Sequence, residues 1–207
     1  MNKNTHVFSI AGPVGQLECA LDLPANPPRG LALIAHPHPL YGGTMDNKVI
    51  HTLVRAFLGI DYVCARMNFR GVGSSEGVHD EGRGETDDMQ ALLDHMRISY
   101  PDLPLALSGF SFGTVVQAQL QQRLSGAGQA VERMVLVGTA AGKWVVPNVP
   151  ENTILIHGEL DETILLSDVF EWARPQDLPV WVIPGADHFF HRKLQHIRNL
   201  VTQMWQR

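Results

Sequence analysis

Six short apolar runs, each separated from the next by a segment of mixed or helical character, limit the fold of this chain most strongly. The runs are continuous rather than alternating, which is typical of strands whose two faces are both covered by helices. They occupy Leu31–Ala35, Tyr62–Met67, Leu103–Ser108, Met134–Val137, Thr153–Ile156 and Val180–Ile183. The helical stretches lie at Asn47–Leu58, Glu85–Ser99, Val115–Leu124, Thr163–Ala173 and Phe189–Trp205. This alternation predicts an α/β domain built on a mostly parallel sheet.

An antiparallel hairpin is expected before the first run, because His6–Ala11 and Gln16–Leu23 flank the turn signal Gly12–Gly15. The chain has 207 residues, of which 44% are apolar and 18% charged, the profile of a globular protein. A domain of this size buries enough surface to fold without a metal or a disulfide. No repeat or linker interrupts the pattern, so we expect residues 1–207 to form a single domain.

Charge and cysteine content narrow the possible partners. The formal net charge is −5, which provides no electrostatic basis for binding nucleic acid. No apolar stretch approaches the length of about eighteen residues that a membrane span needs, and the first residues lack the pattern of a signal peptide. Cys19 and Cys64 lie within apolar stretches and are interpreted as buried thiols, although they could pair. These features predict a cytoplasmic protein and leave its oligomeric state open.

The strongest local motif is Gly109-Phe110-Ser111-Phe112-Gly113, between an apolar run and a helical stretch. Gly-x-Ser-x-Gly at a strand-to-helix turn is typical of a nucleophile elbow, where a strained backbone exposes the serine hydroxyl. The glycines allow close backbone packing, and the helix N-terminus faces any negative charge that develops beside Ser111. In a chain with 19 glycines the alternative is a plain glycine-lined turn. The position of the motif favours Ser111 as a catalytic nucleophile.

A serine nucleophile needs a base and an acid that orients the base, in the chain order Ser, Asp or Glu, His. Asp161 follows the fifth apolar run and His188 follows the last, so both are expected at the same sheet edge as Ser111. Asp161 could instead cap a helix that begins near Glu162. Other candidates remain for each role. The rival acids are Glu162, Asp168 and Asp187, and the rival bases include His157 and His191.

Cofactor motifs are incomplete in this sequence. His36 and His38 are close together, but no Cys or carboxylate lies at metal-ligand spacing from them. Gly71-Val72-Gly73 lacks the third glycine of a dinucleotide site, because Glu76 occupies its position. Gly109–Thr114 is not followed by the Lys-Ser/Thr pair of a phosphate-binding loop. We therefore expect neither a metal nor an organic cofactor.

The order and context of Ser111, Asp161 and His188 resemble the α/β-hydrolase superfamily over essentially the whole chain. The segments His36–Asn47 (HPHPLYGGTMDN) and Asn68–Gly77 (NFRGVGSSEG) resemble a narrower group, the small lidless bacterial serine hydrolases. The resemblance implies the α/β-hydrolase fold, with about eight mostly parallel strands flanked by helices and no cap domain. Because that group consists largely of predicted hydrolases, it implies a mechanism more firmly than a substrate.

Acyl transfer creates an alkoxide that two backbone N–H groups stabilise in an oxyanion hole. One donor is expected to be Phe112, the residue after the nucleophile. The other should come from the loop after the first apolar run, where prolines have no N–H to offer. Aligning the superfamily pattern His-Gly-x-x-Gly with His38–Gly42 makes Leu40 the donor, and aligning it on His36 makes His38 the donor. We expect Leu40.

Aromatic residues near the same edge, Tyr41, Trp144 and Phe189, are candidates for substrate binding. Arg70 follows the second run and could meet an anionic substrate, but a structural hydrogen-bonding role is favoured. Only the segment Thr139–Asn152 connects the fourth and fifth runs, which leaves no room for a helical cap. We therefore expect an open, shallow site that takes small or flexible acyl groups.

The functional prediction is a serine hydrolase, carboxylesterase-like, that cleaves a small ester through an acyl-enzyme. A peptidase or thioesterase with the same triad is the first alternative. A catalytically silent binding protein of the same fold is the second, because a fold alone does not imply a function. No nucleic acid or membrane partner is expected.

Overall fold

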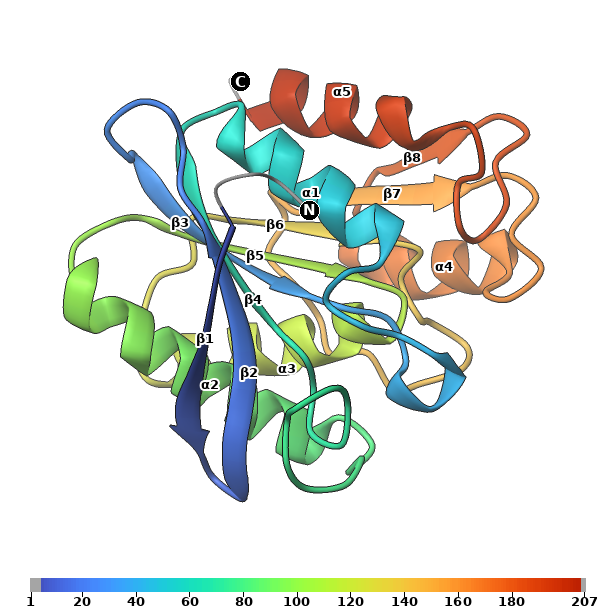
Figure 1. Ribbon diagram of the computed structural model, residues 1–207. Helices are drawn as coiled ribbons and strands as arrows, with labels where there is room; N and C mark the ends of the chain where they lie inside the picture. The colour runs from blue at the N-terminus through green and yellow to red at the C-terminus, as the bar shows by residue number, and fades with distance from the viewer. Residues whose placement is uncertain (1–4, 206–207) are drawn as a thin grey trace.

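The computed structural model describes residues 5–205, whose strands form one eight-stranded sheet of order β1-β2-β4-β3-β5-β6-β7-β8 (Figure 1). The strands are β1 (Thr5–Gly12), β2 (Gly15–Asp22), β3 (Gly30–Ala35), β4 (Tyr62–Met67), β5 (Leu105–Phe110), β6 (Arg133–Val137), β7 (Ile154–Gly158) and β8 (Val180–Ile183). Strand β2 runs antiparallel to both of its neighbours, and every other pair is parallel. The predicted hairpin and mostly parallel sheet are confirmed.

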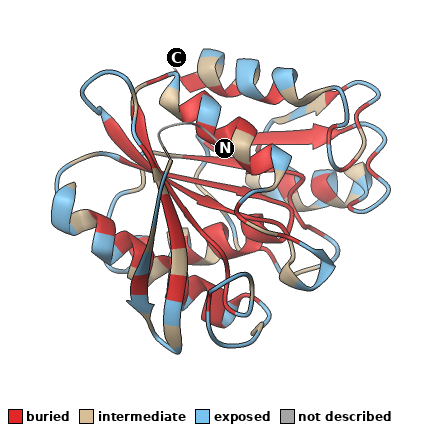
Figure 2. Ribbon diagram, in the orientation of Figure 1, coloured by how far each residue is buried: buried red, intermediate tan, exposed pale blue. Residues whose placement is uncertain are grey.

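Helices cover both faces of this sheet (Figure 1). Helices α1 and α5 lie on one face, and α2, α3 and α4 lie on the other. Their bounds are α1 (Lys48–Leu58), α2 (Arg83–Ser99), α3 (Phe112–Gly126), α4 (Leu166–Ala173) and α5 (Leu194–Trp205), with short 3-10 helices η1 (Pro39–Tyr41) and η2 (Arg174–Gln176). Strands β3, β4 and β5 are buried along their whole length (Figure 2), as their continuous apolar sequences require.

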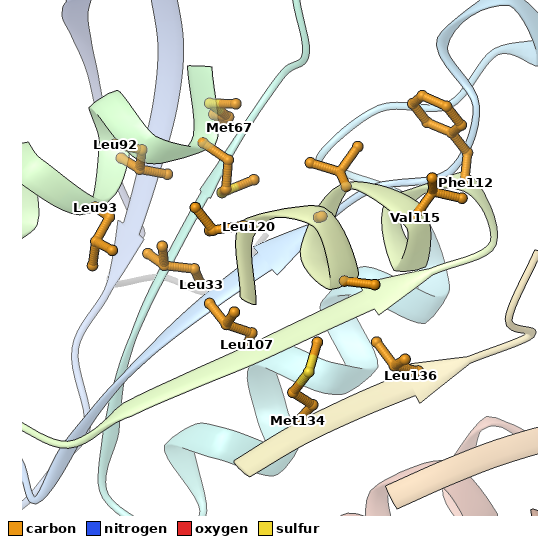
Figure 3. Close-up of a cluster of buried hydrophobic side chains, with 14 of the residues drawn as sticks. Leu33, Met67, Leu92, Leu93, Leu107, Phe112, Val115, Leu120, Met134 and Leu136 are labelled. Atoms are coloured by element: carbon orange, nitrogen blue, oxygen red, sulfur yellow. The ribbon is translucent and has the colours of Figure 1, made fainter. Parts of the chain in front are cut away.

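The core between the sheet and helices α2 and α3 is largely aliphatic, with Phe112 and several methionines in the same cluster. Figure 3 shows Leu33 and Leu107, from adjacent strands, beside Leu120 of α3. Leu92 and Leu93 of α2 enter the same cluster. This packing places α3 against β5 and so positions the turn that joins them.

Helices α4 and α5 begin later than the sequence pattern indicates. The prediction placed the last helix from Phe189, but the structure begins it at Leu194. Phe190 and Arg192 have φ angles of 53° and 61°, a left-handed backbone that cannot continue a right-handed helix. The residues after β8 therefore form a looped turn, which carries His188.

The connection between β6 and β7 contains no helix in residues 138–153, all of which the structure describes. Its only regular feature is an isolated bridge between Ala141 and Trp144. The absence of a cap domain predicted from this short segment is therefore observed. No helix within residues 5–205 is long and apolar enough to cross a membrane.

Arg70 has a structural role, as favoured from the sequence. Its guanidinium donates two hydrogen bonds of 2.7 Å to the Asp88 carboxylate and a third to the carbonyl of Gly84. Both charged side chains are buried, and the pairing joins the loop after β4 to α2. A buried guanidinium engaged in this way is not free to bind a substrate.

Candidate active site

The turn from β5 to α3 has the strained backbone of a nucleophile elbow. Ser111 has φ 53° and ψ −123°, a conformation that few non-glycine residues adopt. The Ser111 N–H donates to the carbonyl of Val137 at the end of β6, and the Ser111 carbonyl accepts from Thr114. These bonds hold the strained residue in place.

The two glycines of the motif are required because backbone atoms of other residues lie very close to their Cα positions. A Cβ on Gly109 would lie 2.5 Å from the carbonyl oxygen of Gly113. A Cβ on Gly113 would lie 2.3 Å from the carbonyl oxygen of Ala35, on the neighbouring strand β3. No side chain fits at these distances, so α3 can begin directly after Ser111 only if both positions lack a side chain.

The structure brings the predicted serine, acid and base together. His188 Nε2 lies 3.0 Å from Ser111 Oγ, and His188 Nδ1 lies 2.7 Å from Asp161 Oδ2. All three residues are buried, each with less than a tenth of its surface exposed. They come from the ends of β5, β7 and β8, which share one edge of the sheet (Figure 1). This is the hydrogen-bond order in which a base is oriented by an acid and activates a hydroxyl.

Asp161 contacts both His188 and the turn that follows it, and the N-cap of α4 is Leu165 rather than Asp161. Its Oδ1 accepts hydrogen bonds from the N–H groups of Thr163 and Ile164, at 2.9 Å and 2.8 Å. Its Oδ2 faces His188. The turn that this carboxylate stabilises precedes α4, which explains why that helix begins only at Leu166. Three hydrogen-bond donors compensate for the burial of the negative charge.

Within residues 5–205, no rival acid or base forms a hydrogen bond with Ser111 or His188. Glu162 is exposed, and Asp187 forms a 2.5 Å contact with His191 Nδ1 on the surface. His157 is buried, and its Nε2 lies 3.0 Å from the Ile164 carbonyl and 3.5 Å from Asp161 Oδ2. Burial lowers the pKa of His157, so the ring is neutral at neutral pH. Through these contacts His157 supports the turn that carries Asp161.

The loop after β3 does not present Leu40 as a free donor. The Leu40 N–H donates to His38 Nδ1 at 3.2 Å, and the Leu40 side chain is 71% exposed. The His38 N–H has no hydrogen-bond acceptor among residues 5–205. The Phe112 N–H, at the first position of α3, has no partner within the helix. The geometry thus favours His38, the alternative alignment, over the expected Leu40.

A cavity of about 400 Å³ opens beside Ser111. Tyr41 and Trp144, both expected at the substrate site, are among the residues that line it. Phe189 does not line it; the Phe189 ring lies against His188, with 5.2 Å between the two ring centroids. The sequence did not indicate that His38 and Phe112 also line it. Rings that meet in space but belong to separate segments of the chain leave no local sequence pattern from which their contact could be predicted.

Comparison with known proteins identifies the family of the chain. The family described as serine aminopeptidase, S33, matches residues 27–188. The chain belongs to this family. It is 31% identical to the uncharacterized protein RP471 of Rickettsia prowazekii over 202 residues, which cover 92% of this chain and 84% of that protein.

Two solved structures of similar sequence have the same fold. An α/β serine hydrolase without a lid, XC6422 from Xanthomonas campestris, is 30% identical with a TM-score of 0.90, over 100% of this chain and 95% of that one. An alpha-beta serine hydrolase homologue from Coxiella burnetii is 33% identical with a TM-score of 0.87, over 96% of each chain. The S33-family chain therefore has the lidless α/β-hydrolase fold that its motifs resemble.

His36 stabilises the loop that this S33-family protein places beside its candidate nucleophile. The His36 ring is buried. Its Nε2 accepts a hydrogen bond of 2.9 Å from the Phe69 N–H, and its Nδ1 lies 2.6 Å from the carbonyl oxygen of Pro37. The neutral ring with a proton on Nδ1 satisfies both bonds, and both nitrogens are engaged, so His36 is not available to a metal. Burial lowers the pKa of His36 to about 3.

This histidine is expected to make the protein less stable in acid. Below the ordinary histidine pKa of about 6.5 the unfolded chain binds a proton at His36, whereas the folded protein does so only near pH 3. Its contribution is therefore complete above pH 6.5 and is lost as the pH falls toward 3, by about 1.4 kcal/mol per pH unit. Urea unfolding of wild type and His36→Gln between pH 6 and 4.5 measures this slope. Equal slopes in the two proteins would contradict the assignment.

The two cysteines are not alternative nucleophiles. Cys19 and Cys64 are free and buried. Burial raises the pKa of the Cys19 thiol to about 12 and that of Cys64 well above its usual value. Both thiols therefore stay protonated and unreactive at neutral pH.

Proposed function

We propose that this S33-family chain is a serine hydrolase that cleaves a small ester through an acyl-enzyme on Ser111, with His188 as base and Asp161 as the orienting acid. The observation that carries the proposal is the pair of contacts of His188, 3.0 Å to the Ser111 hydroxyl and 2.7 Å to the Asp161 carboxylate. Their occurrence at a strained elbow favours catalysis over a structural hydrogen-bond network.

In this mechanism the Ser111 hydroxyl proton passes to His188 Nε2 while Oγ forms a bond to the substrate carbonyl carbon. The π electrons of the carbonyl move to its oxygen. The resulting oxyanion accepts hydrogen bonds from the backbone N–H groups of Phe112 and His38. When the carbonyl reforms, the bond to the leaving oxygen breaks and that oxygen takes the proton from His188. Water then repeats the sequence and releases the acid and free Ser111. No metal or organic cofactor takes part.

Labelling with a fluorophosphonate tests the nucleophile directly. We expect an adduct of one probe per chain, located on Ser111 by peptide mass analysis, because the probe reacts with activated serine hydroxyls. His188→Ala should react much more slowly, since the base is gone. Folded wild-type protein that acquires no adduct would support the catalytically silent alternative.

The leaving group is tested by a matched substrate series. Peptidase and thioesterase activity use the same triad, and the family description itself names an aminopeptidase. We expect higher kcat/KM for nitrophenyl esters than for acyl thioesters or aminoacyl anilides. Faster turnover of an anilide or a thioester would replace the ester assignment and leave the acyl-enzyme mechanism intact.

A cytoplasmic location is part of the same proposal. Both thiols are free and buried, and no helix in the described part of the chain could span a membrane.

A small-molecule ester is the partner that a pocket of this size suits.

A further inference from the structure

Under the proposed function, the cavity beside Ser111 receives the acyl part of the substrate. In that mechanism His188 gives a proton to the leaving oxygen, so the leaving group must lie next to the imidazole. The cavity is lined by Ser111 but not by His188 or Phe189. Its walls come instead from the β3 loop, the elbow, the segment around Trp144 and the turn Glu162–Ile164. The part of the substrate that enters it is therefore the acyl group.

One wall of this acyl pocket consists of rings in mutual contact. His38 is at their centre, with ring centroids 4.8 Å from Tyr41, 4.9 Å from Phe112 and 5.5 Å from Trp144. Phe112 and Trp144 also meet edge to face at 4.9 Å. Such tilted and edge-on arrangements are the favourable ones for aromatic pairs. Three separate segments thus contribute to one aromatic surface.

A second layer holds this surface in place. The His79 ring lies 4.7 Å from His38 and 5.3 Å from Phe112, and its Nδ1 lies 2.8 Å from the buried carboxylate of Glu85. Glu85 also accepts the N–H groups of Asp80 and Gly82, which fixes it. Burial and the neighbouring His79 lower the pKa of His38, so His38 is a neutral ring in the wall.

The charges that line the cavity are of opposite sign. Lys143 and Glu162, both exposed, line it from separate segments of the chain. A cation and a carboxylate together do not select for the net charge of an acyl group. Selection inside the pocket therefore depends on shape and on contact with the rings.

We propose that this pocket selects acyl groups that end in a flat aromatic ring over saturated rings of the same carbon count. The inference rests on the proposed function and names its substrate class. An aryl ring can stack on or meet edge-on the faces of Trp144 and Tyr41, whereas a puckered cyclohexyl ring makes only nonspecific apolar contact. A volume of about 400 Å³ accommodates a phenyl ring with a short linker.

The test compares 4-nitrophenyl phenylacetate with 4-nitrophenyl cyclohexylacetate. The leaving group is the same, and the methylene separates each ring from the carbonyl, so intrinsic reactivity is similar. We expect kcat/KM to favour the phenyl ester by about 10-fold, mostly through KM, because ring contacts bind the ground state and the transition state alike. A ratio of one or less would overturn the proposal.

Two matched variants locate the effect. Trp144→Leu keeps an apolar side chain but removes the ring, and should bring the phenyl-to-cyclohexyl ratio close to one. Trp181→Leu alters a tryptophan that is 38% exposed on β8 and does not line the cavity, and should leave the ratio unchanged. A ratio that stays near 10 in Trp144→Leu would show that the selection does not come from this pocket.

A binding measurement separates this inference from the proposed function. Ser111→Ala is titrated with phenylacetate and with cyclohexylacetate, with protein chemical shifts followed by NMR. We expect the phenyl acid to bind several-fold more tightly, and equal affinities would overturn the inference. If the wild type neither hydrolyses esters nor reacts with a fluorophosphonate, the proposed function fails, and this titration still decides whether the pocket selects aryl groups.

Discussion

Replacing Ser111 by alanine is expected to lower kcat/KM for nitrophenyl esters by several orders of magnitude while the protein stays folded. The hydroxyl is the atom that bonds to the substrate, and enzymes of this mechanism lose about a millionfold in kcat when it is removed. Alanine fits the site, because Ser111 makes its structural hydrogen bonds through its backbone. Initial rates with purified protein, together with a thermal melt, measure both parts of the prediction.

Ser125→Ala is the matched control for this experiment. Ser125 lies in the last turn of the same helix, α3, and is exposed, so this variant should keep wild-type kcat/KM and thermal stability. Substantial residual hydrolysis by Ser111→Ala, within tenfold of wild type, would show that another group attacks the substrate.

Asp88→Asn is expected to destabilise the fold by about 3–5 kcal/mol, because it leaves the Arg70 charge buried without its partner. The Asp88 side chain is 0% exposed and Arg70 is 7% exposed. The two 2.7 Å hydrogen bonds between them therefore cannot be replaced by water. Urea unfolding at neutral pH measures the difference in the free energy of unfolding.

The neighbouring residue provides the control. Asp87 forms an ion pair of the same length, 2.7 Å, with Arg123, but these side chains are 50% and 44% exposed. Asp87→Asn should cost less than about 1 kcal/mol, because water screens an exposed pair and solvates its remaining charge. In the double variant Arg70→Met/Asp88→Leu much of the lost stability should return, since no unpaired charge is left buried. Equal losses for Asp87→Asn and Asp88→Asn would refute this account.

Much of the fold could be predicted because it follows from interactions between residues close in the chain. The bounds of β4 and β8 agree with the predicted runs, and Asn47 caps α1 where the pattern placed its start. The predicted starts of α4 and α5 were too early. There a side chain that binds a turn, or a residue with a left-handed backbone, prevents the helix from beginning where the apolar pattern begins. Asp161 binds the turn before α4, and Phe190 and Arg192 delay α5.

The site divides in the same way. The sequence by itself determined the elbow and the order of Ser111, Asp161 and His188, because a glycine-flanked turn is local and parallel strands bring their carboxyl ends to one edge. Only the tertiary structure decided that the Leu40 N–H is taken by His38 and that Phe189 lies outside the pocket.

The aromatic wall and the partner of Arg70 also required the folded chain. His38 and Trp144 are far apart in sequence, and their rings meet only because the sheet order places β3 beside β5 and β5 beside β6. Arg70, in the loop after β4, meets Asp88 on helix α2, eighteen residues further along the chain. Side-chain packing between separate loops depends on where the strands lie, and no pattern of neighbouring residues contains that information.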